Sequence, residues 1–473
     1  MDLLLIDPPR KYWGFGGGLG LFSQPVGITT LAGYMVDQGV SVEILDCNIL
    51  GIGWDQLPAE IEGRAPKAVG VSSSMTCFVP DAFRCVEIAK SINPEMITIG
   101  GGLQFSIAPE ESLRRCAALD VIVRGDGEFT ALELMAEISS GKRQYQNILG
   151  LSFRNDQTIL HNDDRSPIED LDALPFPAWE LIPMDQYRLP AVPQRWGNIA
   201  IIVTTKGCPY HCSFCSPIAG QNPFRAMSAE RVLEWLEILY EQFHTRVFWF
   251  SDLSFNVHRD RTERILDGII ERGWKVHIAL DGTRTDLFLR DRELVPKMKR
   301  AGVFLVCLGV ESYFEPDLDY YRKGTTLQKA EQAVALAKEH GINSWCFFML
   351  GNPNHTEEDI LKILDYAKEL DPTIAIFTIV TPIPGTAFYD EMASRGFIHD
   401  TDWSHYDLGH PVMKLPHLGK QQLLDLMDHC YTEFYKRPKK IIRHGIFGDQ
   451  FARDTYRFMR FVGSARQLKE GII

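Results

Sequence analysis

The sequence lacks a hydrophobic segment long enough to cross a membrane. Every apolar run is shorter than the roughly 20 residues that a bilayer-spanning helix requires. The N-terminus carries Asp2 and Asp7, whereas a secretion signal begins with a basic region. We therefore expect a cytoplasmic protein.

Cysteine and positive charge are also scarce. Ten cysteines in 473 residues are too few for a disulfide scaffold and suit a reducing compartment. The net charge of −13 argues against a general nucleic-acid binder. Positive charge is concentrated in residues 436–473, which hold ten Lys and Arg against three acids. The length predicts two or three domains.

Phosphate-binding motifs are missing as well. The glycine-rich segment 14–20 fails the G-x-G-x-x-G spacing, and the chain contains no P-loop. Residues 1–160 contain no histidine. The four cysteines of this region, which we expect to pack in the core, are Cys47, Cys77, Cys85 and Cys116.

Three thiols lie close together in the middle of the chain. Cys208, Cys212 and Cys215 follow an apolar, β-branched run at 199–205. Thiolates are soft ligands that hold iron–sulfur clusters or zinc. Zinc bound with the help of His211 is one alternative, although no second cysteine pair lies nearby. Buried, inert cysteines are another.

The spacing C-x-x-x-C-x-x-C, together with Phe214 and the preceding apolar run, resembles the radical S-adenosylmethionine (SAM) superfamily. The resemblance implies that the three cysteines hold a 4Fe–4S cluster. The fourth iron then binds SAM, and reductive cleavage of SAM releases a 5'-deoxyadenosyl radical.

The first 140 residues alternate between short apolar strands and helices. The pattern predicts a doubly wound parallel sheet, whose ligands bind at the carboxyl ends of the strands. We expect strands at 3–6, 42–45, 68–72, 96–99 and 121–123, with helices at 28–38, 81–91 and 129–138.

The residues that follow these strands resemble the cobalamin-binding domain that precedes many radical SAM cores. Because no histidine is present, the resemblance implies cobalamin bound without a histidine ligand from this domain. The alternative is a degenerate flavodoxin-like domain that only shapes the substrate cavity. The cobalamin contacts implied are Pro8, Pro9, Gly27, Asp46, Ser72, Gly101, Gly102, Gln104, Gly125, Gly127 and Glu128.

Residues 195–396 show six strand–helix units, which predict a partial (β/α)6 barrel with its chemistry at the carboxyl ends of the strands. Ser228, Thr325 and Thr356 are the expected helix starts. Strands are expected at 199–204, 247–250, 276–280, 304–309, 344–350 and 375–380.

The strand ends of this core resemble the SAM-binding signatures of the superfamily. A helix cap for Asp252, a surface position for Arg284 and structural turns for the glycine and proline motifs are the alternatives. The SAM contacts implied are Phe214, Asp252, Arg284, Glu311, Gly351, Pro353 and Pro382.

We therefore predict a cobalamin-binding domain at 1–150, a linker at 151–194, a radical SAM core at 195–396 and a helical region with a basic tail at 397–473. The tail is compatible with docking on an anionic membrane, with gripping an acidic substrate, or with a solvated helix.

The resemblance implies a methyltransferase that uses the 5'-deoxyadenosyl radical and methylcobalamin to methylate an unactivated carbon. A cyclase resembling the anaerobic magnesium-protoporphyrin IX monomethyl ester cyclase is the alternative, and a non-catalytic zinc-bearing binding protein is a distant one. The expected partners are a lipid, isoprenoid or tetrapyrrole substrate and a flavodoxin or ferredoxin reductant, but no nucleic acid.

Overall fold

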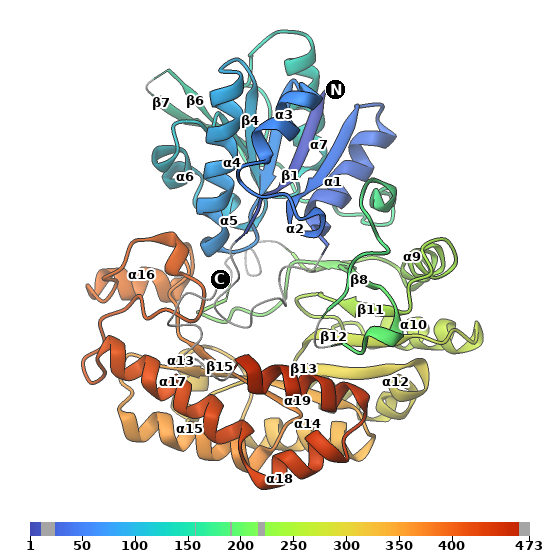
Figure 1. The fold of residues 1–473 in the computed structure, drawn as a ribbon, viewed down its shortest axis with the longest axis vertical. Coiled ribbons are helices and arrows are strands. Elements are labelled where there is room, and N and C mark those ends of the chain that lie inside the picture. The colour runs from blue at the N-terminus through green and yellow to red at the C-terminus, as the bar shows by residue number, and fades with distance from the viewer. Residues whose placement is uncertain (11–23, 157, 190–191, 216–222, 463–473) are drawn as a thin grey trace. The chain divides into compact units, whose positions relative to one another are not determined.

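A computed structural model describes residues 1–10, 24–156, 158–189, 192–215 and 223–462 (Figure 1). These residues form two compact units. The first contains residues up to 186 together with 402–404, and the second contains most of the remaining chain.

The first unit is built on a seven-stranded sheet in the order β2-β1-β3-β4-β5-β6-β7. Strands β1 to β5 pair in parallel, which confirms the doubly wound sheet. They are β1 (Leu3–Asp7), β2 (Val42–Asp46), β3 (Ala68–Ser72), β4 (Ile97–Gly101) and β5 (Val121–Val123). The helices are α1 (Val26–Asp37), α2 (Cys47–Leu50), α3 (Leu57–Arg64), α4 (Val79–Ile92), α5 (Leu103–Ile107), α6 (Pro109–Arg115) and α7 (Gly127–Ser139).

Part of the predicted linker belongs to this sheet. Residues 151–161, which we placed in the linker, instead form β6 (Leu151–Asn155) and β7 (Thr158–His161). Both pair antiparallel and extend the sheet beyond β5. Leu151 and Phe153 are buried in its core, so these strands contribute apolar surface to the first unit. The four cysteines of this unit are buried, as predicted.

The second unit is built on a six-stranded sheet in the order β15-β14-β13-β12-β11-β8. All its neighbouring strands pair in parallel, which confirms the partial barrel. The strands are β8 (Ile199–Ile202), β11 (Val247–Phe250), β12 (His277–Thr283), β13 (Val303–Glu311), β14 (Asn343–Leu350) and β15 (Ile374–Ile379). The helices are α9 (Ala229–Glu241), α10 (Arg259–Glu271), α11 (Thr285–Arg290), α12 (Val295–Ala301), α13 (Glu315–Tyr320), α14 (Leu327–Glu339) and α15 (Glu357–Leu370).

Two of the three predicted helix starts are confirmed. Ser228 caps α9, and Thr356 caps α15 with a capping box. The prediction of Thr325 for α14 is wrong by one residue, because Thr326 accepts the hydrogen bond from the Lys329 N–H. The Thr325 hydroxyl is buried and hydrogen-bonds the Thr285 hydroxyl instead.

The C-terminal region is helical, as predicted, and covers one edge of the barrel sheet (Figure 1). The Tyr431 hydroxyl both donates to and accepts from the backbone of Phe377 at 3.1 Å. The Tyr435 hydroxyl does the same with Ala375 at 2.9 and 3.0 Å. Backbone groups of the edge strand β15 are thereby paired. The helices are α16 (Ala387–Ser394), α17 (Lys420–Tyr435), α18 (Pro438–Lys440), a π-helix, η6 (Ile441–Ile446), and α19 (Gln450–Val462).

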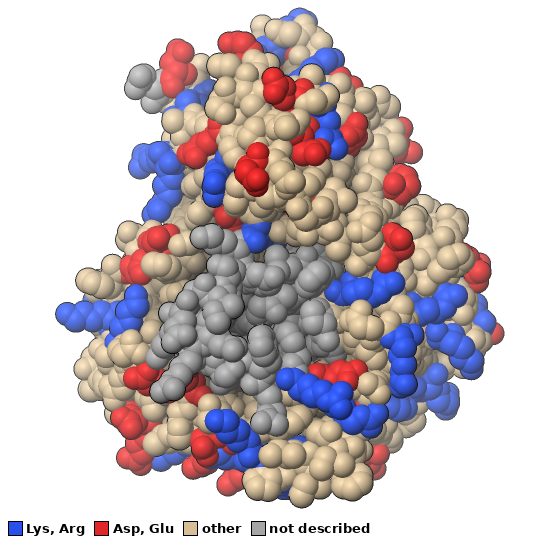
Figure 2. Space-filling model, in the orientation of Figure 1, with Lys and Arg blue, Asp and Glu red and all other residues tan. Residues whose placement is uncertain are grey.

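Three cations of the basic tail point into the protein. Arg437, Lys440 and Arg443 all form ion pairs with Asp371, at 3.0, 3.8 and 3.1 Å. These three cations therefore serve tertiary structure. Within the described ranges, no helix has the length and apolar character needed to cross a membrane. On the face shown in Figure 2, Lys and Arg side chains gather around α10 and α12.

Candidate functional site

The cysteine loop leaves the barrel through a short hairpin. β9 (Thr205–Lys206) pairs with β10 (Arg225–Ala226), and Gly207 turns the chain with a φ of +77°. Cys208, Cys212 and Cys215 are all partly exposed. Burial raises the pKa of the Cys208 thiol, while the cations of Arg284 and Lys323 oppose that rise. Three thiols in one loop are a donor set whose chemistry suits an iron–sulfur cluster, although the structure, which describes all three, does not gather their sulfurs around one point.

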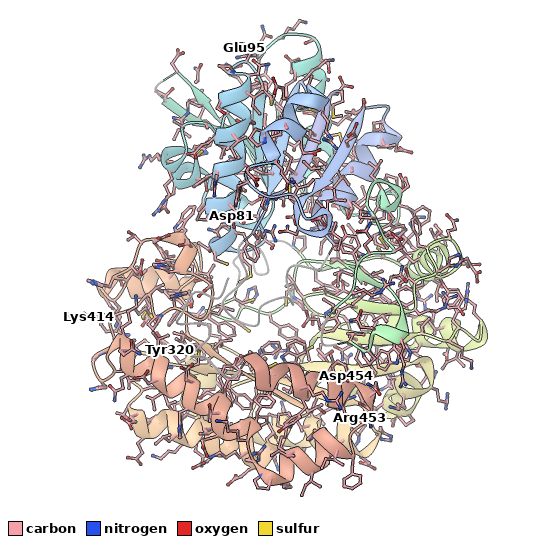
Figure 3. The ribbon with its side chains drawn as sticks, viewed as in Figure 1. Asp81, Glu95, Tyr320, Lys414, Arg453 and Asp454 are labelled. Carbon is pink, nitrogen blue, oxygen red and sulfur yellow. The ribbon has the colours of Figure 1, made fainter. Side chains whose placement is uncertain are left out.

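This loop is held by segments that follow two other strands. The Ser213 N–H donates to the Tyr321 carbonyl at 2.9 Å, and the Phe388 N–H donates to the Ser213 carbonyl at 2.9 Å. The Ser213 hydroxyl also donates to the carbonyl of Tyr320 at 3.3 Å. Tyr320, labelled in Figure 3, donates its own hydroxyl to Glu391 at 2.9 Å. The segments that follow β8, β13 and β15 therefore meet at the loop, as the barrel prediction requires.

Arg284 lies beside the loop and is only partly exposed. Its guanidinium stacks over the Tyr210 ring at 3.6 Å and bonds Asp286 at 2.9 Å. It also donates to the Lys323 carbonyl at 2.8 Å. Phe214 packs edge-on against Tyr321, with ring centroids 5.3 Å apart. Two of the predicted SAM contacts thus lie in or against the cysteine loop.

Glu311 forms a mostly buried ion pair at the end of β13. Its carboxylate lies 2.5 Å from the Lys323 ammonium. Glu311 has a φ of +70°, a left-handed backbone conformation that is costly for a residue other than glycine. A Cβ on Gly309 would lie 2.3 Å from the Glu311 carboxylate and 2.5 Å from the Lys323 ammonium. The glycine therefore makes room for the pair.

Asp252 has contacts that we did not predict. Its buried carboxylate accepts hydrogen bonds from the backbone N–H and hydroxyl of both Thr204 and Thr205, at 2.6 to 2.9 Å. It therefore fixes the backbone just before the cysteine loop rather than capping a helix. Burial raises the pKa of Asp252, and nearby Arg261 opposes the rise.

The signatures after β14 and β15 are packed into the protein. Gly351 has a φ of +81°, and a Cβ there would lie 2.9 Å from a methyl of Leu423, so packing alone requires this glycine. Pro353 and Pro382 are buried.

Asp317 is a residue that sequence reasoning missed. It accepts hydrogen bonds from the Ser312 hydroxyl at 2.5 Å and from the Asn352 amide at 3.0 Å. The carboxylate oxygen that accepts from Ser312 also lies 2.8 Å from Nε2 of His355. Asp317 thereby ties together the ends of β13 and β14. No local pattern distinguishes it from an exposed helix residue.

Asp281 in β12 was also missed, although an acid within an otherwise apolar strand is a usable signal. Burial raises its pKa, while hydrogen bonds from Cys307, Trp249 and Ser251 oppose the rise. Trp249 meets Trp345 edge-on at 6.0 Å. The acid therefore lies among aromatic groups of the barrel sheet.

In the first unit, the sheet order places β1 beside both β2 and β3, which is the switch point where open α/β sheets bind ligands. Pro8 and Pro9 follow β1 and are buried. The preceding Asp7 forms an ion pair with Arg10 and accepts from the Asn48 amide at 2.9 Å. Asp46 accepts hydrogen bonds from two backbone N–H groups and so caps α2.

The end of β4 offers a buried polar atom to a ligand. The Gln104 side-chain oxygen accepts from Thr76 at 2.8 Å, while its Nε2 is buried without a hydrogen-bond partner among the described residues. Gly102, with a φ of +87°, lies so close to Ser72 that a Cβ would be 2.5 Å from its hydroxyl. An unpaired amide beside a close backbone turn suits a polar ligand such as cobalamin.

The other predicted cobalamin residues are spread along the same part of the first unit. A Cβ on Gly27 or Gly125 would meet no atom within 4 Å, so space is open there. Gly101 ends β4, and Gly127 with buried Glu128 begins α7. In the described part of the chain, no three His, Cys, Asp or Glu side chains are gathered around a point that could hold a metal ion.

Comparison with known proteins places each cofactor prediction on one unit. Residues 14–135 match the family model of the B12 binding domain, and residues 202–367 match that of the Radical SAM superfamily.

The chain is similar over nearly its full length to several enzymes. It is 32% identical to the uncharacterized methyltransferase PH0819 of Pyrococcus horikoshii, over 94% of both chains. It is 28% identical to the anaerobic magnesium-protoporphyrin IX monomethyl ester cyclase of Rubrivivax gelatinosus, over 92% of this chain and 77% of the relative. The fold matches the radical SAM methyltransferase TsrM from Kitasatospora setae, solved with cobalamin and a 4Fe–4S cluster. The TM-score is 0.72 at 18% identity, over 98% of this chain and all of TsrM.

Proposed function

Because the chain belongs to the cobalamin-dependent radical SAM enzymes, we propose that it methylates an unactivated carbon of a small molecule. The family's cofactors are a 4Fe–4S cluster, SAM and cobalamin. The observation that carries methyl transfer is the similarity to PH0819, which spans both units.

In this proposal Cys208, Cys212 and Cys215 hold the cluster. When bound, the cofactors supply the electron that cleaves SAM and the methyl group that is transferred. The chain's own groups orient SAM: the Arg284 guanidinium suits its carboxylate, and the Glu311 carboxylate suits the ribose hydroxyls.

Neighbouring residues keep these groups in place. The ion pair with Lys323 holds the Glu311 carboxylate in place, and Asp286 fixes the direction of Arg284. Asp252 acts as a positioning residue, because its hydrogen bonds hold Thr204 and Thr205 ahead of the loop. Phe214 provides an apolar face in the loop. We keep Gly351, Pro353 and Pro382 as backbone that shapes the SAM site.

For cobalamin, we propose that the ligand lies along the carboxyl ends of β1 to β5. Gln104 offers its unpaired amide, and Gly102 permits close backbone approach. Since no histidine occurs in residues 1–160, this part of the chain supplies no histidine to cobalt. The further contacts proposed are Pro8, Pro9, Gly27, Asp46, Ser72, Gly101, Gly125, Gly127 and Glu128.

A ring-forming oxidoreductase is the second candidate, and the similarity to the Rubrivivax cyclase favours it. This relative also makes a tetrapyrrole one of the proposed substrates, next to a lipid or isoprenoid. Either reaction needs an external electron donor, which we propose to be a flavodoxin or ferredoxin.

The deciding experiment uses SAM carrying a deuterated methyl group with anaerobically reconstituted protein. Methyl transfer places the label in the product, whereas ring formation yields 5'-deoxyadenosine and an unlabelled product. Substrates to offer are a lipid, an isoprenoid and magnesium-protoporphyrin monomethyl ester. The control is the variant Cys212→Ser, which we expect to lose cluster iron and both activities. Zinc without iron after anaerobic purification would contradict both candidates.

A further inference from the structure

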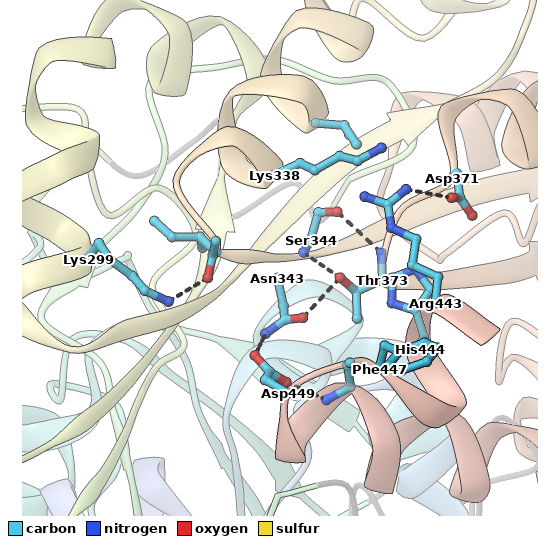
Figure 4. A pocket seen from close by; sticks show the side chains of 15 residues that line it. Lys299, Lys338, Asn343, Ser344, Asp371, Thr373, Arg443, His444, Phe447 and Asp449 are labelled. Carbon is cyan, nitrogen blue, oxygen red and sulfur yellow. Dashed lines mark hydrogen bonds and ion pairs between the residues drawn. The ribbon is translucent and has the colours of Figure 1, made fainter. Parts of the chain in front are cut away.

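A pocket of about 620 Å³ lies at the opposite end of the barrel from the cysteine loop (Figure 4). It is formed where β14 begins, between α14 and the π-helix η6. The strand starts contribute Asn343, Ser344 and Thr373, and η6 contributes Arg443 and His444. The catalytic groups discussed above all follow the carboxyl ends of the strands, so they do not account for this pocket.

More cationic than anionic side chains line the pocket. Lys299, Lys338 and Arg443 line it, against Asp371 and Asp449. Asp371 already pairs with three tail cations. Asp449 accepts hydrogen bonds from the Asn343 amide at 2.9 Å and from the Ala452 N–H at 2.8 Å. Both acids are therefore engaged by other groups.

Lys338 is a lining cation without a direct hydrogen-bond or ion-pair partner among the described residues. Figure 4 shows its side chain extending toward Arg443. Partial desolvation and the positive charge of Arg443 lower the pKa of Lys338, while the Asp371 carboxylate opposes the shift. Two neighbouring cations whose one nearby carboxylate, Asp371, is shared with Arg437 and Lys440 form a place where an anion is stabilised.

His444 is a further residue that lines the pocket. The residue is 8% exposed, and its Nε2 is buried without a hydrogen-bond partner among the described residues. Burial lowers the pKa of His444 to about 3, so the ring is neutral at pH 7 and has a single N–H to donate.

The backbone that presents these groups is unusual. η6 is a π-helix, in which the Phe447 N–H donates to the Ile442 carbonyl five residues earlier at 3.0 Å. π-Helical turns are rare and often occur at functional sites.

The outer rim of the pocket is apolar and exposed. Phe447, which lines the pocket, is 80% exposed; Ile442 and Ile446 of η6, which do not line it, are 51% and 56% exposed. Side chains of this kind are rarely clustered on a surface without a contact to cover them.

We propose that the pocket bounded by Lys338, Arg443 and His444 binds a phosphate group that is attached to an apolar molecule. A phosphate offers several acceptor oxygens to the lysine ammonium and to the guanidinium. The exposed Phe447 then covers the apolar part. This inference does not depend on the proposed methyl transfer. The phosphate can come from a soluble phosphate ester or from a phospholipid headgroup.

The first experiment measures binding of inorganic phosphate to the reconstituted full chain by calorimetry at constant ionic strength. We expect saturable binding that becomes at least about tenfold weaker in Lys338→Gln, because a charge-assisted contact is lost. The matched control is Lys275→Gln, an exposed lysine of the same unit that does not line the pocket. Since Lys338 is exposed, its variant should retain the thermal unfolding profile of the unaltered chain.

The second experiment measures co-sedimentation with phosphatidylglycerol vesicles and with phosphatidylcholine vesicles. A lipid source predicts binding to phosphatidylglycerol alone, lost in both Lys338→Gln and Phe447→Ser. A soluble source predicts phosphate binding that Phe447→Ser leaves unchanged, with no vesicle binding. Failure to bind either probe, equal binding of the two vesicle types, or binding that survives in Lys338→Gln would overturn the proposal.

Discussion

Gly309→Ala is the substitution that best separates the proposed SAM site from the rest of the fold. The added Cβ would lie 2.3 Å from the Glu311 carboxylate, where ordinary contacts begin at 3.4 Å. Glu311 and Lys323 must therefore move by about 1 Å, and a misplacement of that size weakens an oriented contact strongly. A charge-assisted hydrogen bond contributes about 1.5–3 kcal/mol, so we expect a Kd for SAM that is about 10- to 100-fold higher.

The assay is calorimetric titration of SAM into anaerobically reconstituted protein, with iron content measured on the same sample. The cluster should be retained, because Gly309 contacts none of the three cysteines through the atoms nearest its position. Gly419→Ala is the matched control, since a Cβ there meets no atom within 4 Å. If Gly309→Ala kept normal iron and bound SAM as tightly as the unaltered chain, the proposed role of Glu311 would be refuted.

Three further predictions follow from single contacts. Tyr431→Phe should speed hydrogen exchange of the β15 segment about tenfold or more, measured by mass spectrometry, because the backbone N–H and C=O of Phe377 both lose a buried partner. Unchanged protection from exchange would contradict the proposal that Tyr431 covers the edge of the sheet. Asp252→Asn should lower the iron bound per chain, since an amide cannot accept all four hydrogen bonds that hold the loop, and full iron occupancy would count against it. The hydrogen bond that the His410 ring donates to the Asp407 carboxylate raises the pKa of His410, so its stabilisation is present below about pH 6.5 and is lost as pH rises through the folded pKa. Thermal unfolding of His410→Asn should lose that pH dependence, and an unaltered profile would disprove the assignment.

The sequence alone determined the elements that local chemistry specifies. Buried parallel strands read as short apolar runs, so Ala68–Ser72 and Val247–Phe250 were predicted to the residue. The cysteine spacing is likewise visible because its three members lie within one loop. Caps such as Ser228 and Thr356 were readable, since their partners lie three residues away.

Only the tertiary structure decided which distant residues meet. Asp252 binds threonines 47 and 48 residues earlier, and Tyr431 binds a strand 54 residues before it. The local sequence around Asp317 and Asp371 does not predict that each of them contacts three polar or charged side chains. Such partners depend on sheet order and on where helices pack, and a buried polar group takes whichever donors the assembled fold brings within hydrogen-bond distance.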